Sequence, residues 1–124
     1  MSLSTTPNTY PYPNEPKWSK SEKAIARAAF DAALKRELQE VMQEVKQKAN
    51  QIRKPAELWE LERYLTERRK QIDHKYDSRA SHLTRVFGML LRERRITEQE
   101  LRSLGEDKVN TIRSCAKFLS EEIA

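Results

Sequence analysis

A long stretch almost without helix-breaking residues constrains the fold of this chain most. Between Lys17 and Ala124 there is one proline, Pro55, and there are two glycines, Gly88 and Gly105. Strand-rich folds need turn residues at short, regular intervals, and this stretch lacks them. We therefore expect an all-α protein.

Helix boundaries can be predicted along this stretch. Ser19 followed three residues later by Glu22 is a capping-box pattern, and good helix formers then continue to Lys54. We predict a first helix from about Ser21 to Arg53. Its apolar side chains recur at alternating steps of four and three, which is typical of a coiled-coil seam; they are Leu34, Leu38, Val41 and Val45.

Pro55 suits the first position of a second helix, because its missing N–H would be unpaired there anyway. The apolar register continues far enough for this helix to reach about Arg94, or to break near Asp77-Ser78, and both alternatives stay open. Further on, Thr97 and Glu100 form a second capping-box pattern that opens a short helix. Gly105 is a plausible left-handed residue ending it, and Glu106-Asp107 would begin a last helix.

Apolar residues are scarce for two helices that each carry a stripe. The hydrophobic set makes up 37% of the 124 residues and the charged set 35%. Either the first helix folds back on the second, or the stripes pair with those of another copy, and the small apolar inventory favours the second alternative. We expect a homodimer in which two long helices form a coiled-coil-like stalk beside a small C-terminal helical head. Residues 1–17, rich in proline, are expected to be a disordered tail, and residues 18–124 a single helical domain.

The sequence gives little support for a catalytic site or a metal site. His74 and His82 are two helical turns apart, and Cys115, without a thiolate motif around it, is expected to be a buried inert thiol. We expect no enzyme activity, no cofactor and no metal. The lone cysteine fits a reducing compartment, the cytoplasm, and no apolar run has the length of a signal peptide or membrane span.

Nucleic-acid binding is a third-ranked alternative. The net charge is +5, and basic residues cluster at Arg68-Arg69-Lys70 and from Arg92 to Arg95. The last helix, which would read the DNA in a helix-turn-helix arrangement, begins with two acidic residues, and these would repel phosphate. Protein binding is the better expectation.

One segment of the sequence is more specific. It contains Leu58-Trp59-Glu60-Leu61, Tyr64-Leu65, Arg68-Arg69 and the run Ile72-Asp73-His74-Lys75-Tyr76-Asp77-Ser78-Arg79. This pattern resembles the fluorescence recovery protein family of cyanobacteria, and the resemblance extends over about Trp18 to Phe118. It implies a small helical dimer that binds the orange carotenoid protein, accelerates its return from the active red form to the resting orange form, and releases it from the phycobilisome.

The resemblance also implies roles for individual residues. It assigns partner binding to Trp59, Glu62, Arg63, Arg69, Arg85 and Thr111, although Trp59 could equally be a core or dimer anchor. It assigns Tyr76, Asp77 and Arg79 a structural contact between stalk and head. Five positions depart from the family pattern: Glu62 and Arg63 replace a His-Asp pair, Arg85 an aromatic residue, Thr111 a basic one and His74 a glycine. The alternative is therefore a diverged relative, in an organism without phycobilisomes, that keeps the dimer scaffold and binds a different protein.

Overall fold

The computed structural model describes residues 17–123, without the side chains of Ala80, Glu122 and Ile123. The predicted tail lies outside these residues except for Lys17. The elements are, in chain order, α1 (Lys20–Asn50), α2 (Pro55–Lys75), the 3-10 turn η2 (Ala80–His82), α3 (Leu83–Arg92), the 3-10 turn η3 (Gln99–Leu101) and α4 (Glu106–Ile123). No strand occurs in this part of the chain, so the all-α prediction is confirmed.

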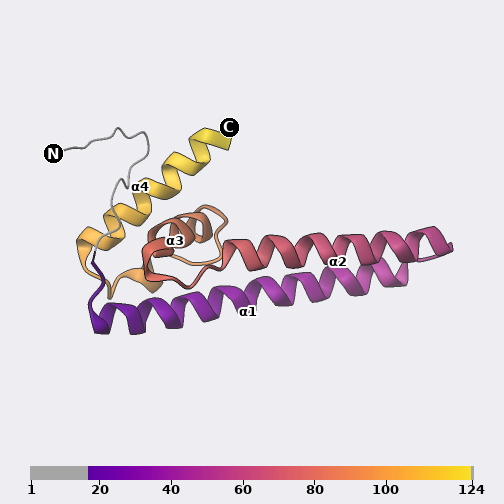
Figure 1. The fold of residues 1–124 in the computed structure, drawn as a ribbon, viewed down its shortest axis with the longest axis horizontal. Coiled ribbons are helices and arrows are strands. Elements are labelled where there is room, and N and C mark those ends of the chain that lie inside the picture. The colour runs from indigo at the N-terminus through magenta and orange to yellow at the C-terminus, as the bar shows by residue number, and fades with distance from the viewer. Residues whose placement is uncertain (1–16, 124) are drawn as a thin grey trace.

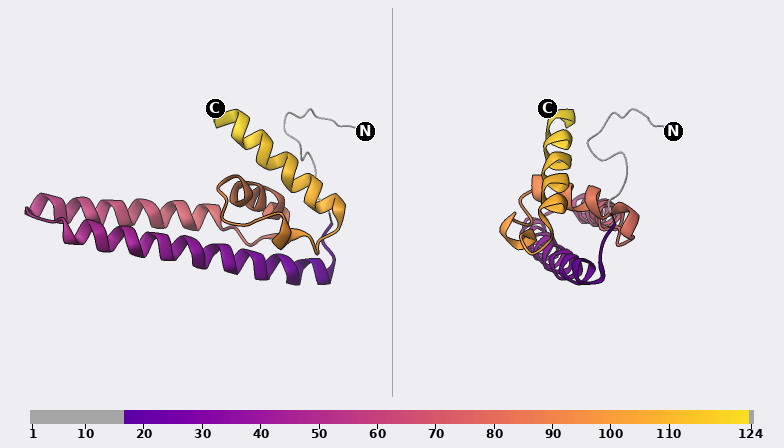
Figure 2. Two further views of the ribbon diagram at one scale, coloured as in Figure 1. Left: turned by 180° about the vertical axis from the view of Figure 1, so that it is seen from behind. Right: turned by 90° about the vertical axis from the view of Figure 1, so that its left-hand side faces the viewer.

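The two longest helices form an antiparallel hairpin (Figures 1 and 2). Both predicted starts are confirmed. Ser19 caps α1, since its hydroxyl accepts the Glu22 N–H at 3.1 Å and its own N–H donates to the Glu22 carboxylate at 2.9 Å, and Pro55 opens α2. At 1.5 Å per residue, α1 is about 46 Å long. Folding back within one chain was the alternative that the sequence favoured less.

A tight turn joins the two helices. The predicted first helix continues to Arg53, whereas α1 ends at Asn50. Lys54 is extended (φ −134°, ψ 151°), as the residue before a proline must usually be. The Glu57 carboxylate accepts the backbone N–H groups of Arg53 and Lys54 at 2.7 and 2.9 Å. These bonds satisfy donors that the chain reversal leaves without helical partners.

The second helix breaks, which settles the alternative left open above. It ends at Lys75, and Tyr76 caps it with φ −89° and ψ 64°. Just beyond, the Asp77 carboxylate accepts the Arg79 N–H at 3.1 Å, a local bond that competes with helical hydrogen bonding. The chain can then turn, and α3 packs back beside the hairpin (Figure 2).

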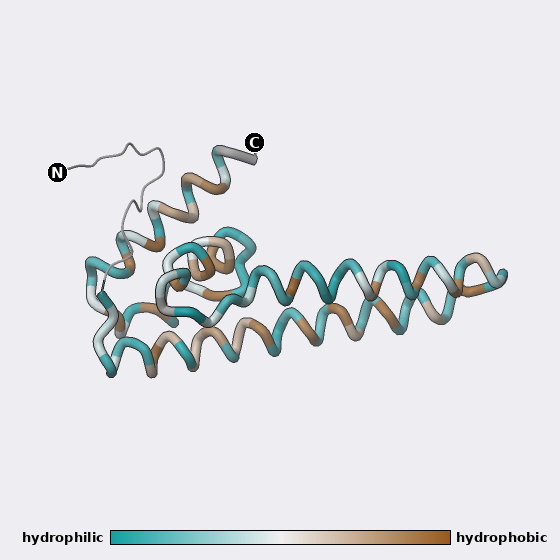
Figure 3. Tube along the Cα trace, viewed as in Figure 1, coloured by the Kyte–Doolittle hydropathy of each residue, from teal (hydrophilic) through white to brown (hydrophobic). Residues whose placement is uncertain are grey.

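The main core lies where the first half of α1 meets the head, formed by α3, η3 and α4. Phe30 of α1 stacks edge-on against Tyr76 at 5.3 Å between ring centroids. Figure 3 shows hydrophobic segments gathered in the head and alternating with hydrophilic ones along the hairpin. The buried cluster contains Trp18, Ala26, Ala29, Phe30, Ala33, Leu83, Val86, Phe87, Leu90, Ile96, Leu101, Leu104 and Ile112.

Two details of the head differ from the sequence predictions. The Thr97–Glu100 capping box is present, with bonds of 2.9 and 3.2 Å, but it opens a single 3-10 turn rather than a helix. Gly105 has no positive φ, so its predicted left-handed role is wrong. Its carbonyl instead accepts the N–H groups of Lys108 and Val109 and thereby starts α4. The left-handed residue of the head is Arg94, with φ 62°.

Candidate partner-binding surface

Trp59 lies near the hairpin tip on the surface of α2. Its side chain is 60% exposed, so it belongs to no core of the single chain. Glu62 and Arg63, one turn further along, are also exposed, and neither forms an ion pair within residues 17–123. An exposed tryptophan beside unpaired charges is typical of a contact surface.

Arg69 follows Trp59 by ten residues, almost three turns of α2. Its Nε lies 3.8 Å from Asp73 Oδ2, and the two side chains are 86% and 72% exposed. Such an exposed pair contributes little to stability, about 0–1 kcal/mol. The Arg69 guanidinium therefore remains available to a partner.

The two other predicted partner residues lie on the head. Arg85 is half-buried on α3. Thr111 lies on α4, where its hydroxyl donates to the Asp107 carbonyl at 2.8 Å. The structure thus divides the six predicted residues between the hairpin and the head.

Four exposed apolar side chains lie along the hairpin, and we call them the apolar flank: Leu38, Met42, Leu58 and Leu65, which are 41–57% exposed. Three of them directly follow residues on the side of the other helix, namely Glu37, Val41 and Tyr64, and Leu58 follows Glu57, which binds the turn between the helices. With about 100° between successive residues, this places all four on the same side of an antiparallel pair. Of the predicted seam, Val41 is buried between the helices, Leu38 belongs to the apolar flank, and Leu34 and Val45 are half-buried.

The three predicted structural residues beyond α2 behave differently. Tyr76 joins α2 to α1, since its hydroxyl donates to Glu37 at 2.8 Å. Asp77 and Arg79 pair with one another at 2.6 Å, and His82 Nδ1 lies 3.5 Å from the same carboxylate. The Arg79 guanidinium, through hydrogen bonds and its charge, holds the pKa of Asp77 well below its usual range. The ion pair between Asp77 and Arg79 therefore stabilises the connection from α2 to η2.

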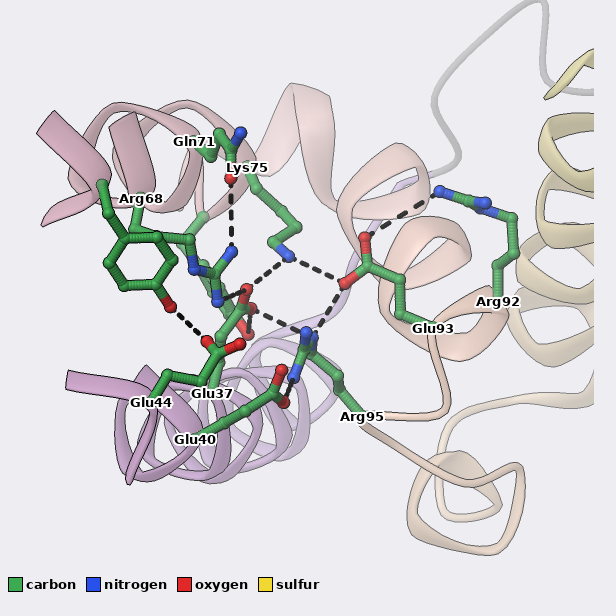
Figure 4. A network of polar contacts seen from close by, with 11 residues as sticks. Glu37, Glu40, Glu44, Arg68, Gln71, Lys75, Arg92, Glu93 and Arg95 are labelled. Atoms are coloured by element: carbon green, nitrogen blue, oxygen red, sulfur yellow. Dashed lines mark hydrogen bonds and ion pairs between the residues drawn. The ribbon is translucent and has the colours of Figure 1, made fainter. Parts of the chain in front are cut away.

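A charged network lies where the hairpin meets the head (Figure 4). At its centre the Glu37 side chain is fully buried. Its carboxylate pairs with Lys75 at 2.8 Å and with Arg68 and Arg95 at 3.2 Å. Lys75 and Arg95 also reach Glu93, at 2.7 and 2.8 Å. One buried carboxylate therefore links α1, α2 and the segment after α3.

Opposing effects set the ionisation of this centre. Burial disfavours the charged carboxylate, but hydrogen bonds from Lys75 and Tyr76 and the charges of Lys75 and Arg95 outweigh it. The pKa of Glu37 consequently lies below its usual value. Burial and the Glu37 carboxylate raise the pKa of the Tyr76 hydroxyl well above its usual range. At neutral pH, Glu37 is ionised and Tyr76 is a hydrogen-bond donor.

Comparison with known proteins decides the family. A sequence profile of the photoprotection regulator fluorescence recovery protein matches residues 18–116. The chain is 38% identical over 104 residues to the fluorescence recovery protein of Synechocystis sp. (strain ATCC 27184 / PCC 6803 / Kazusa), covering 84% of this chain and 95% of that protein. The chain belongs to the fluorescence recovery protein family.

Solved structures of the family share this fold. The fluorescence recovery protein of Fremyella diplosiphon superposes with a TM-score of 0.78 at 36% identity, and that of Synechocystis sp. PCC 6803 with a TM-score of 0.78 at 38% identity. Each match covers 82% of this chain and 99% of the other. The resemblance inferred from the segment around Trp59 is confirmed, and with it the role of a photoprotection regulator.

Sequence reasoning missed the most buried charge of this family member. Glu37 lies three residues after Leu34 and four before Val41, so it is on the helix face next to the predicted apolar seam. An ionisable residue there requires buried partners. The sequence therefore indicated that Glu37 needs a partner. It did not indicate which residues these partners are, because they lie 31 to 58 positions further along the chain.

Other predictions concern chemistry that the chain was expected to lack. In the part that the structure describes, no group of three or more His, Cys, Asp or Glu residues could hold a metal ion. Among the same residues no helix is long and apolar enough to cross a membrane. Cys115 is buried, as predicted. α4 begins with Glu106 and Asp107 at its amino-terminal end, which disfavours DNA reading by this helix.

Proposed function

We propose that this chain is a non-enzymatic, homodimeric, cytoplasmic regulator that binds the orange carotenoid protein and accelerates its return from the red to the orange form, releasing it from the phycobilisome. Family membership supports this role. The observation that carries it is the exposed surface of α2, where Trp59 is 60% exposed and Arg69 forms only a long, solvent-exposed ion pair with Asp73. Aromatic and arginine side chains dominate protein interfaces.

The proposed mechanism requires no bond chemistry. A regulator can accelerate a conformational change by binding the intermediate arrangement more tightly than the starting one. A scaffold with binding residues on both hairpin and head can hold separated parts of a partner close to the arrangement they must regain. The direct test measures dark recovery of photoactivated orange carotenoid protein with and without equimolar chain. Unchanged recovery together with no binding would exclude this function.

A specific observation favours the alternative of a diverged partner. Arg63 is an exposed, unpaired cation where the family pattern has a carboxylate, and Arg85 replaces an aromatic residue. Like charges brought together across an interface cost several kcal/mol, so a changed charge implies a changed partner surface. If a typical family member accelerates recovery and this chain does not, the alternative gains support.

We expect the homodimer to depend on the apolar flank. Leu38→Glu puts a carboxylate into apolar surroundings, which should weaken dimerisation by about 2 kcal/mol, roughly thirtyfold. Sedimentation over a concentration series should then show the monomer–dimer equilibrium shifted to about thirtyfold higher concentration. Gln43→Glu introduces the same charge at another exposed position of α1 and should leave the dimer intact. A monomeric wild-type chain at tens of micromolar would contradict the dimer proposal.

We also expect the charge reversal at the α2 surface to weaken binding of an unaltered orange carotenoid protein. The double change Glu62→His with Arg63→Asp restores the family residues and should strengthen binding about tenfold and speed recovery. The gain should shrink at high salt, because exposed charges are screened. If the unmodified chain already matches the Synechocystis relative in recovery assays, Glu62 and Arg63 lie off the binding surface.

A further inference from the structure

The basic run from Arg92 to Arg95 has no part in the function proposed above. Two of its arginines are used inside the molecule: Arg95 pairs with Glu37, Glu40 and Glu93, and Arg92 lies 3.9 Å from Glu93. Arg94 differs from both. It is exposed, and within residues 17–123 its side chain forms no hydrogen bond or ion pair.

The backbone of Arg94 is strained. Its φ is 62°, the left-handed region in which a Cβ approaches the following carbonyl oxygen. It follows the last turn of α3, where its N–H donates to the Leu91 carbonyl at 3.1 Å and the Arg95 N–H donates to the Leu90 carbonyl at 2.9 Å. Helices that end in this way usually have glycine at the left-handed position. An arginine here costs stability without giving an internal contact in return.

The neighbours of Arg94 hold this conformation in place. On one side, the Glu93 carboxylate is bound by Lys75 at 2.7 Å and by Arg95 at 2.8 Å. On the other, the Arg95 carbonyl accepts the Arg36 guanidinium at 2.7 Å. The exposed guanidinium of Arg94 thus projects from a backbone that is fixed on both sides. A fixed attachment point lowers the entropy lost when such a side chain binds.

We propose that Arg94 is a partner contact that binds a carboxylate on an acidic protein surface, and this inference rests on the proposed protein-binding function. Strained residues that persist without internal compensation are typical of functional positions. Arginine pairs with carboxylate through two parallel hydrogen bonds. Nucleic acid is a poorer match, because phosphate binding sums many cations. Three other cations of this region are already paired within the chain, since Glu93, Glu100 and Glu98 bind Arg95, Arg36 and Arg113 respectively.

The test compares Arg94→Gly with the wild type in the full-length chain, using purified cyanobacterial orange carotenoid protein as the probe. Glycine relieves the strain, so Tm should rise by about 3–5 °C at fixed concentration. Affinity should nevertheless fall about tenfold, and the difference should shrink at high salt. A merely structural role could not raise stability and weaken binding together. Arg94→Lys should keep part of the affinity, and Arg102→Ala, which removes another exposed head arginine, should leave it unchanged.

Three results would overturn the inference. Unchanged affinity of Arg94→Gly alongside normal wild-type binding defeats it while leaving the proposed function intact. No binding by the wild type defeats the proposed function and this inference with it. If the wild type binds a labelled DNA duplex at physiological salt and Arg94→Gly does not, the group that Arg94 binds is a phosphate and not a carboxylate.

Discussion

Glu37→Gln should destabilise the folded chain by about 3 kcal/mol at neutral pH, because it removes a fully buried carboxylate that three cations share and leaves the more exposed Glu93 and Glu40 to balance them. The amide can still accept the Tyr76 hydroxyl, but it cannot balance Lys75 and Arg95, which approach this carboxylate to 2.8 and 3.2 Å. Thermal unfolding at fixed protein concentration should show a fall in Tm of about 10 °C. Glu37 should therefore be among the least replaceable charges of the chain.

A matched control lies one turn away on the same helix. Glu40 pairs with Arg95 at 2.7 Å, but its side chain is 49% exposed. Glu40→Gln should cost less than about 1 kcal/mol, since solvent replaces the lost interaction. Equal losses for the two variants would show that burial of Glu37 does not set its contribution.

The same network predicts how stability depends on pH. The pKa of Glu37 is lowered in the folded chain relative to its ordinary value of 4.5. Its contribution is therefore fully present above about pH 4.5 and is lost as the pH falls through the lowered value. The stability difference between wild type and Glu37→Gln should be constant from pH 6 to 8 and shrink in acid. A difference that does not shrink as the pH falls below 4.5 would contradict this assignment.

How much of this molecule could be predicted from its sequence depends on the range of the interaction. Local rules gave the capping box at Ser19, the start of α2 at Pro55 and the acidic start of α4, because each depends on a few neighbouring residues. The end of α2 at Lys75 stayed open, since the apolar register continues past it. It is fixed by Tyr76, whose hydroxyl bonds Glu37 in another helix.

The candidate surface was predictable to a similar extent. The family pattern identified Trp59 and Arg69, and the structure places both on the exposed surface of α2. It gave no indication that Arg94 would adopt a left-handed conformation, because glycine is the residue that signals such a position. Helix-capping rules, in turn, predicted a left-handed conformation at Gly105, where the structure has none. Residue preferences fail where tertiary contacts decide the backbone.

Gly88→Val should destabilise the chain by about 3 kcal/mol, because α3 and α4 cross at this residue without room for a side chain. A Cβ at Gly88 would lie 2.6 Å from Cys115 Sγ, 2.8 Å from Cys115 Cβ and 3.3 Å from the Ala116 nitrogen. Rotating the Cys115 side chain could relieve the first contact but not the other two. Even alanine, which improves helix propensity by about 1 kcal/mol, should be destabilising here.

Gly105 offers the comparison that isolates this cause. A Cβ there would also come within 2.6 Å of another atom, but that atom is the exposed Asp107 carboxylate oxygen, which can move away. Gly105→Ala should therefore be nearly neutral in thermal unfolding, whereas Gly88→Ala should cost about 1–2 kcal/mol. The double variant Gly88→Ala with Cys115→Gly places the glycine on α4 instead of α3. Its loss of stability should therefore be smaller than the sum of the losses of the two single variants. Strict additivity would mean that the two residues do not share this contact, and that the crossing of α3 and α4 tolerates a side chain at position 88.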